Sequence, residues 1–425
     1  MKKTAFLLLA LLLVIPALSN AASVTSRYDV TFGGFVKYDL GYSTQNTHAD
    51  PATAFRGSSS DRAVMADEYG NTFATGGETR FSFLVKGPDL WGARTSAFIE
   101  GDFRGVTTGN QYGGFQLRHA FMKMNWQSAE LMIGQNWQQW GMPYYISAIG
   151  ANDFAQYLKG IRTPQIAYRF FIGKEFNAMF GVTSATDWSD GTRQYNDGYA
   201  RSNWPGLQGE IVYWTDRCGK IGPHNMKFAL GGYYGKDEEL TDPITDVTKS
   251  DRVNAWVTAF RYSIPIIPEK QGNKAMAVLL NGNFFIGQNV AGNNWMSPGN
   301  PSPSNGAYLR PGRDAAAPTL FGLYAQASWW LTDTLSLNGM YGYLKYNYSE
   351  WARTNNAPAR DRVNMMQAYA ANLLWDANQA IRFGIQWMTM FTGFNGKGQG
   401  AGTGAGFADG NGQVDQYRFA AWYFF

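Results

Sequence analysis

The chain has 425 residues and a formal net charge of +4, a balance too small to indicate a nucleic-acid partner. Hydrophobic residues make up 45% of the chain and aromatic residues 16%, with 15 Trp and 49 Gly. Beyond the N-terminal segment no stretch approaches the ~18 apolar residues of a membrane-spanning helix. These features exclude a bundle of membrane helices and favour strands with one face in lipid and the other in water.

Residues 1–21 predict a secretory signal peptide. Two lysines open the segment, an apolar core follows at 6–15, and the small residues "SNA" at 19–21 supply a cleavage site. Cleavage near Ala21 leaves a mature chain, 22–425, of about 404 residues with a formal charge near +2. An uncleaved anchor is the alternative interpretation of this segment.

A two-residue alternation of apolar and polar side chains predicts about sixteen strands in the mature chain. In chain order they lie at 30–42, 79–87, 92–103, 115–126, 129–137, 165–171, 177–183, 207–214, 227–234, 253–264, 275–285, 319–330, 335–348, 367–376, 380–391 and 414–425. The gaps after the even-numbered strands are short and turn-like. Those after the odd-numbered strands are mostly long and polar, the largest being 43–78, 138–164, 286–318 and 392–413.

This sorting of connections by length is typical of a membrane barrel, with short periplasmic turns and long external loops. A soluble β-sandwich is the alternative, but the same water surrounds both of its ends, so it has no reason to sort its loops. We therefore predict an all-β fold, a transmembrane antiparallel β-barrel over 22–425 with no domain boundary. We expect it in the outer membrane of a Gram-negative bacterium, in contact with lipid and lipopolysaccharide.

The chain ends in an aromatic strand, "DQYRFAAWYFF". An exposed strand edge invites aggregation, and in a bilayer it would also leave backbone groups without hydrogen bonds. The last strand is therefore expected to pair with the first and close the sheet. The alternation then directs Tyr417, Phe419, Tyr423 and Phe425 outward, toward acyl chains.

Four motifs in the first third of the chain resemble the trimeric porins of the DcaP-like type, within the general bacterial outer-membrane porins. They are T-R-F-x-F at 79–83, I-E-G-D-F at 99–103, L-R-H-A-F at 117–121 and G-Q-N-W at 134–137. The remainder of the chain agrees with this family only in pattern. The resemblance implies a homotrimer, although the short stretch before the first strand lacks the periplasmic helical segment found in some members.

The alternating aromatics before the final phenylalanine also resemble the C-terminal signal of outer-membrane proteins. This resemblance implies that Tyr423 and Phe425 are recognised by the barrel-assembly machinery.

A barrel of this strand number encloses an aqueous channel, because its interior is too wide for side chains to fill. In general porins a long loop folds into the lumen, and the resemblance assigns that role to the gap at 138–164. Its tyrosines and other apolar residues suit packing against a wall, and Asp153, Lys159 and Arg162 would form its polar face. The alternative is a surface loop that covers the trimer axis.

Alternation directs eleven charged side chains toward the lumen, since an Arg near the middle of the lipid face costs about 2–4 kcal/mol. They are Lys37, Asp39, Arg80, Glu100, Asp102, Arg118, Arg169, Glu210, Arg261, Arg382 and Arg418. Seven of the eleven are basic, and guanidinium groups bind carboxylates in a bidentate manner. We therefore hypothesise a modest preference for anions, including small dicarboxylates. The alternative is that these ions pair with one another and only keep the wall polar.

No enzymatic site is expected. The three histidines, His48, His119 and His224, are far apart in sequence and form no zinc motif. Alternation predicts that His119 points outward, away from any catalytic partner. No metal and no cofactor are expected. The single cysteine, Cys218, excludes an internal disulfide and is interpreted as a free cysteine in a turn, with a reactive thiol as the alternative.

The sequence therefore predicts a porin, a water-filled channel for passive diffusion of small polar solutes. The alternative is a barrel scaffold that docks a partner protein. Such a scaffold would either surround a cytochrome in an electron conduit or act as a surface adhesin through its long loops. A barrel that surrounds a cytochrome needs a wider lumen, with more than about twenty strands.

Overall fold

The computed structural model describes residues 28–45, 47, 69–105, 113–150, 153, 154, 157, 162–184, 204–242, 246–288, 308–310, 313–316, 319–347, 363–394 and 411–425. The predicted signal peptide, His48 and Lys159 lie outside the described residues. Within these ranges, no helix is long and apolar enough to cross a bilayer.

The described chain is built almost entirely of strands. They are β1 (Asp29–Ser43), β2 (Asn71–Thr75), β3 (Arg80–Lys86), β4 (Arg94–Gly105), β5 (Gly114–Asn125), β6 (Ala129–Trp137), β7 (Arg162–Ile172), β8 (Phe176–Thr183), β9 (Gly206–Ile221), β10 (His224–Asp242), β11 (Asp246–Ile267), β12 (Val278–Gln288), β13 (Tyr308–Arg310), β14 (Arg313–Ala316), β15 (Thr319–Trp330), β16 (Leu335–Asn347), β17 (Val363–Asp376), β18 (Ile381–Phe394) and β19 (Asn411–Phe424).

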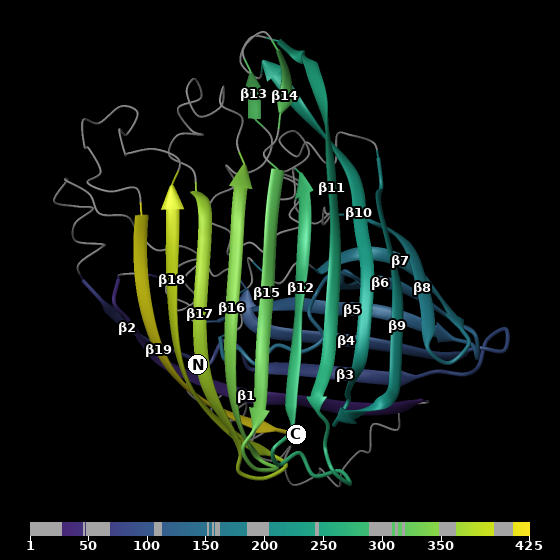
Figure 1. The fold of residues 1–425 in the computed structure, drawn as a ribbon. Coiled ribbons are helices and arrows are strands. Elements are labelled where there is room, and N and C mark those ends of the chain that lie inside the picture. Colours follow the sequence, from purple (N-terminus) through teal and green to yellow (C-terminus); the bar gives the residue numbers. More distant parts are fainter. Residues whose placement is uncertain are drawn as a thin grey trace, which may run out of the picture.

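These strands form one closed antiparallel barrel, with the β13–β14 hairpin outside it (Figure 1). The large sheet contains 17 strands. β2 and β3 pair with different parts of β1, residues 39–43 and 29–35, and therefore share one position. The barrel thus has sixteen positions, and β19 pairs with β1 to close it. The prediction of a closed all-β barrel is confirmed.

Short turns lie at the end of the barrel that holds the C-terminus, at the bottom of Figure 1. At the opposite end β10 and β11, of 19 and 22 residues, rise above the other strands, and β14 lies against β11 (Figure 1). These two strands are longer than predicted.

Two further strand predictions, at β2 and β9, were wrong. β2 lies within a stretch predicted as a loop, and β9 continues through Cys218, which is exposed and lies in a strand rather than a turn. The far end of β9 is largely exposed, so it needs no apolar face and shows no apolar alternation. Alternation can detect only strand segments whose two faces meet different surroundings.

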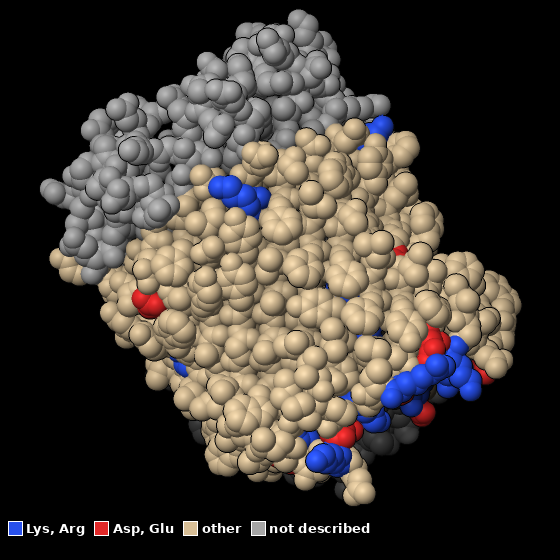
Figure 2. All heavy atoms as spheres, viewed as in Figure 1, with Lys and Arg blue, Asp and Glu red and all other residues tan. Residues whose placement is uncertain are grey.

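The outer wall is apolar. Outward side chains on neighbouring strands are exposed and hydrophobic, among them Phe260, Phe284, Phe321, Trp329 and Ile385. Figure 2 shows this wall nearly free of charge, with most of the visible Lys, Arg, Asp and Glu near the lower rim. This is the surface that hydrocarbon requires.

The seam between β1 and β19 extends to the last residue. The Phe425 backbone N–H donates to the Gly34 carbonyl (3.2 Å), and the Gly34 N–H donates to the Phe425 carbonyl (3.1 Å). On the outer face the Phe425 ring contacts Phe32, with 5.2 Å between ring centroids. Gly34 has a φ of 151°, and a Cβ there would lie 2.1 Å from the Arg80 carbonyl oxygen. Only glycine fits at this crossing.

We predict that Gly34→Val weakens the closed barrel by about 1–3 kcal/mol or more, because it forces both a clash and an unfavourable backbone conformation. The measurement is the fraction of protein that keeps its compact mobility on a gel without heating, followed against temperature. Gly339→Ala is the control, since a Cβ at Gly339 meets nothing within 4 Å. Equal behaviour of the two variants would contradict the role of Gly34.

Candidate functional site

The residues after β6 lie inside the barrel and cover part of its inner wall. Trp140, Phe154 and Tyr157 are at most 1% exposed and belong to a hydrophobic cluster with inward side chains of β6–β8, β10–β12 and β15–β19. Tyr157 sits where Gly342 leaves room, because a Cβ at Gly342 would lie 2.5 Å from the Tyr157 ring. Gly342 on the wall thus makes space for a ring of the inner segment, whose described residues are 138–150, 153, 154 and 157.

Polar contacts fix the backbone of the inner segment to the wall. The Asn283 amide donates to the Gly141 carbonyl (2.9 Å). The Ser147 N–H donates to Gln326 (3.0 Å), and the Asn372 amide donates to the Ser147 carbonyl (2.8 Å). Because the wall supplies both donors and acceptors, the buried backbone of the segment is hydrogen-bonded where these side chains reach it.

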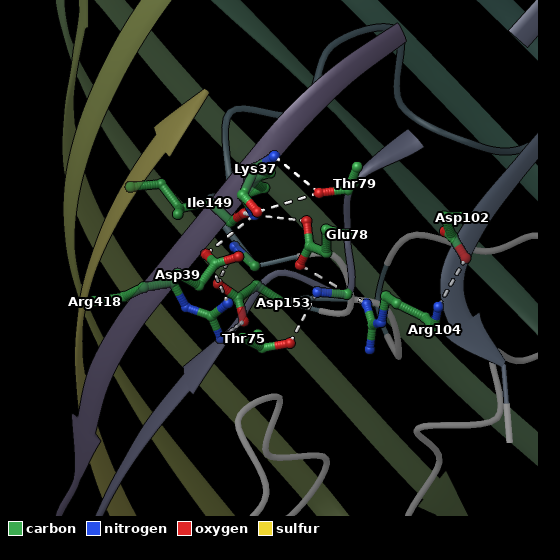
Figure 3. Close-up of polar contacts among 12 residues, drawn as sticks. Lys37, Asp39, Thr75, Glu78, Thr79, Asp102, Arg104, Ile149, Asp153 and Arg418 are labelled. Carbon is green, nitrogen blue, oxygen red and sulfur yellow. Dashed lines mark hydrogen bonds and ion pairs between the residues drawn. The ribbon is translucent and has the colours of Figure 1, made fainter. Parts of the chain in front are cut away.

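A first charge cluster joins the inner segment to the seam (Figure 3). Lys37 Nζ lies 2.5 Å from Glu78 and 3.1 Å from Asp39, and it donates to the Ile149 carbonyl (2.6 Å). Arg418 contacts Asp39 (3.4 Å) and Asp153 (3.6 Å). Lys37, Asp39 and Arg418 point inward, but all three are at most 4% exposed. They therefore lie behind the inner segment rather than along an open path.

A second charge cluster lies on the inner face of β3–β5. The Arg118 guanidinium donates to Glu100 and to Asp102, both at 2.8 Å. Arg80 lies 3.5 Å from Glu100. The structure thus brings together the four charges that alternation placed on these consecutive strands.

The prediction that His119 points outward was wrong. Glu100 pairs with His119 and Gly101 pairs with Leu117, so Arg118 is an extra residue in the register. This β-bulge reverses the alternation, and His119 is buried beside Glu100 (3.6 Å). The Gln135 side chain donates to the Arg118 carbonyl (3.2 Å), which satisfies part of the interrupted ladder. A two-residue pattern cannot reveal such an insertion.

A third charge cluster lies on the inner face of β7–β11, around Tyr144 of the inner segment. Arg261 forms an ion pair with Glu210, donates to the Met142 carbonyl (3.0 Å) and lies over the Tyr144 ring at 4.4 Å. Lys227 lies over the same ring at 5.3 Å. Burial raises the pKa of Tyr144 to about 12, so the phenol stays neutral beside these cations at neutral pH.

Arg169 lies in the same part of the wall and donates to Asn177. Arg169 and Lys227 form no ion pair with any carboxylate of the described residues.

Arg162 and Arg382 lie at the edges of the barrel. Arg162 begins β7, and its guanidinium lies over the Trp137 ring at 5.4 Å. Arg382 lies near the short turns and forms a bidentate pair with Asp376, at 2.5 and 3.1 Å. This pair borders a cavity of ≈ 520 Å³ that the Phe424 side chain and the neighbouring turns also line.

Several residues of the site escaped sequence analysis. Glu78 and Arg104, 3.9 Å apart, belong to the first cluster, and Lys227 belongs to the third. Tyr144 was expected only to pack against a wall, as one of the tyrosines of the loop at 138–164. Glu78 lies between β2 and β3, where no strand pattern exists. Lys227 does follow the alternation of its strand and could have been found. Tyr144 could be placed only once the inner segment was known to contact β10 and β11.

The inner wall is more positive than negative. Each of the inward carboxylates in the three clusters has a cation within ion-pair distance, whereas Arg169 and Lys227 have no ion-pair partner in the described part of the chain. Across the same residues, no group of three or more His, Cys, Asp and Glu side chains could hold a metal ion. The described inner wall presents fixed charges and hydrogen-bonding groups.

A closed barrel of sixteen strands, apolar outside and charged inside, with short turns at one end, has the fold of bacterial outer-membrane porins. The outer membrane channel DcaP of Acinetobacter baumannii is similar in structure, with a TM-score of 0.68 and 17% identity over 94% of this chain and 97% of that chain. An anion-selective porin from Comamonas acidovorans has a TM-score of 0.57 and 12% identity, covering 94% of this chain and 100% of that chain.

OmpF of Salmonella typhi, in a complex with daunomycin, has a TM-score of 0.54 and 11% identity over 94% of this chain and 98% of that chain. The sequence matches no protein-family model and no curated protein. The structural comparisons thus agree with the DcaP-like and general porin resemblance at the level of the fold.

We predict that Arg118→Gln destabilises the barrel by about 3–5 kcal/mol. The substitution leaves the Asp102 carboxylate, which is 0% exposed, without its cation, whereas Glu100 keeps Arg80 at 3.5 Å. Unfolding in denaturant, followed by tryptophan fluorescence in lipid vesicles, measures the change. Lys123→Gln is the matched control. Lys123 pairs with Glu130 at 2.8 Å, but its side chain is 28% exposed, so its loss should cost about 1 kcal/mol or less. Similar costs for both variants would show that burial of the second cluster is unimportant.

Proposed function

We propose that this protein is an outer-membrane porin, a water-filled channel for passive diffusion of small polar solutes that carries out no chemistry. Three features support it: the porin fold, the charged inner wall, and an inner segment that covers only part of that wall. Residues 1–21 would direct export and be removed. Sixteen positions are too few for a barrel that surrounds a cytochrome.

We further propose that the inner segment narrows the channel. Its described polar contacts lie on β9, β11, β12, β15, β17–β19 and β1, and its rings share a hydrophobic cluster with side chains of β6–β8. The open path would then follow the inner face of β3–β5, past the second cluster, and reach the half-buried Arg169 on β7. Lys159, proposed for the polar face of the segment, lies outside the described residues.

The channel is proposed to prefer anions, including small dicarboxylates. The observation that carries this proposal is the imbalance in pairing: the inward carboxylates of the three clusters are neutralised by neighbouring cations, whereas Arg169 and Lys227 are not. The structurally similar porin of Comamonas acidovorans is itself anion-selective, which supports the same sign of selectivity here.

The assembled state is proposed to be a homotrimer in the outer membrane, inserted by the barrel-assembly machinery. The exposed Tyr423 and Phe425 rings at the end of the closing strand are available to that machinery. A trimeric form of a structurally similar outer-membrane protein of Vibrio cholerae, OmpT, supports the oligomer.

We predict that the double variant Arg169→Gln/Lys227→Gln lowers the permeability ratio of chloride to potassium. A unit charge about 6 Å from the ion path is worth about 0.7 kcal/mol in water, so each substitution should lower the ratio by about threefold or less. Reversal potentials in a salt gradient across a planar bilayer provide the measurement.

The matched control is Lys345→Gln, which removes the same charge from an exposed side chain outside the lumen. It should leave the reversal potential unchanged. A wild-type channel selective for cations would contradict the proposed anion preference. The absence of any ohmic conductance would contradict the porin itself and favour the docking scaffold.

A further inference from the structure

We infer that the inner segment clasps the seam of the barrel: Asp153 and the Ile149 carbonyl hold β1 and β19 together through Lys37 and Arg418. Lys37 and Arg418 thus position the inner segment on the seam and help to keep β1 and β19 paired. This inference does not depend on which solute crosses the channel.

The contacts of Lys37 and Arg418 lie at the seam where the two ends of the barrel meet. β1 and β19 are the first and last strands of the barrel, and they pair from Phe35↔Phe424 to Ser43↔Gln416. Lys37 and Asp39 lie on β1, 3.1 Å apart, and Arg418 lies on β19. Asp39 contacts Arg418 across the seam at 3.4 Å. The seam is therefore already bridged by charge on its inner face.

The inner segment adds a second bridge over the first (Figure 3). The Ile149 carbonyl accepts from Lys37 on β1 (2.6 Å), and Asp153 lies 3.6 Å from Arg418 on β19. Asp153 also accepts from the Gly150 N–H (2.9 Å) and from Gln386 of β18 (2.5 Å). A short stretch of the segment thus touches β1, β18 and β19 at once.

Asp153 also contributes to the charge balance of the buried network. Three cations, Lys37, Arg104 and Arg418, meet three carboxylates, Asp39, Glu78 and Asp153, with ion-pair distances of 2.5–3.9 Å along the network. Loss of the Asp153 charge makes this network one unit more positive among side chains of β1 and β19 that are at most 4% exposed. Burial of an unpaired charge is strongly unfavourable, so seating of the segment and closure of the seam stabilise one another.

The charged residues of this network come from distant parts of the chain. Glu78 comes from the connection between β2 and β3, Arg104 from β4, and Asp153 from the segment after β6. Arg418 belongs to the last strand of the chain. The network is complete only when both ends of the barrel and the inner segment are in place, so it couples the folding of the segment to closure.

Hydrogen exchange of the full-length protein in detergent micelles tests this inference with Asp153→Asn. We expect the backbone amides of the seam, 35–43 and 416–424, to exchange about tenfold faster than in wild type, because local opening of the seam becomes easier. Amides of β15 and β16, which lie away from the seam, should not change. Equal seam exchange in folded wild type and variant would overturn the inference, whatever the ion selectivity of either protein.

Tyr157→Phe is the matched control, since it removes a polar atom from the same segment at a site that packs on β16. It should leave seam exchange within about twofold of wild type. If Tyr157→Phe loosens the seam as much as Asp153→Asn does, the effect is a general loss of packing and the clasp is excluded.

A charge-balanced variant covers the case in which Asp153→Asn fails to fold. Asp153→Asn/Arg418→Gln removes one charge of each sign and leaves Lys37 and Arg104 facing Asp39 and Glu78. Because residues that interact directly are not additive, the double variant should recover folded barrel to a greater extent than Arg418→Gln or Asp153→Asn alone. If the double variant loses as much folded barrel as the two single substitutions lose together, the interaction between Asp153 and Arg418 does not hold the seam and the inference is wrong.

Discussion

The structure depends on one constraint: hydrocarbon offers no hydrogen bonds to a backbone, so every strand edge in the bilayer must be paired. Pairing of β19 with β1 meets this constraint. Two backbone hydrogen bonds between Gly34 and Phe425 extend the pairing to the last residue. The same solvent outside the barrel selects exposed aromatic and aliphatic side chains. Charged side chains of the spanning strands therefore gather mainly on the lumenal face.

Inside the barrel, burial divides the charges into two groups with different roles. In the first cluster Lys37, Asp39, Asp153 and Arg418 are buried beneath the inner segment and form ion pairs, which suits a structural role. On the side of the wall that holds the second cluster, Arg80 and Glu100 are partly accessible. Arg169 and Lys227, in the third cluster, form no ion pair with a carboxylate of the described chain. Charges of this second kind can act on a passing solute, because they are not already neutralised.

The fold could be predicted from sequence because each membrane strand meets lipid on one face and water on the other, which imposes a two-residue rhythm. The prediction failed where that contrast ends, in the exposed end of β9, and where the rhythm is broken by one residue, at Arg118. The lumenal site was predicted less completely. Alternation supplied the inward direction of Arg118 and Arg418, but only tertiary contacts separate a covered charge such as Arg418 from an accessible one such as Arg80.

The strands differ in length, and two of them extend well beyond the lipid. A strand of 22 residues extends about 70 Å at 3.3 Å per residue, far more than a tilted strand needs to cross lipid. Among the described residues, β10 and β11, with β14 against β11, therefore project furthest on the side opposite the short turns (Figure 1). Paired backbone thus continues into the aqueous phase on that side.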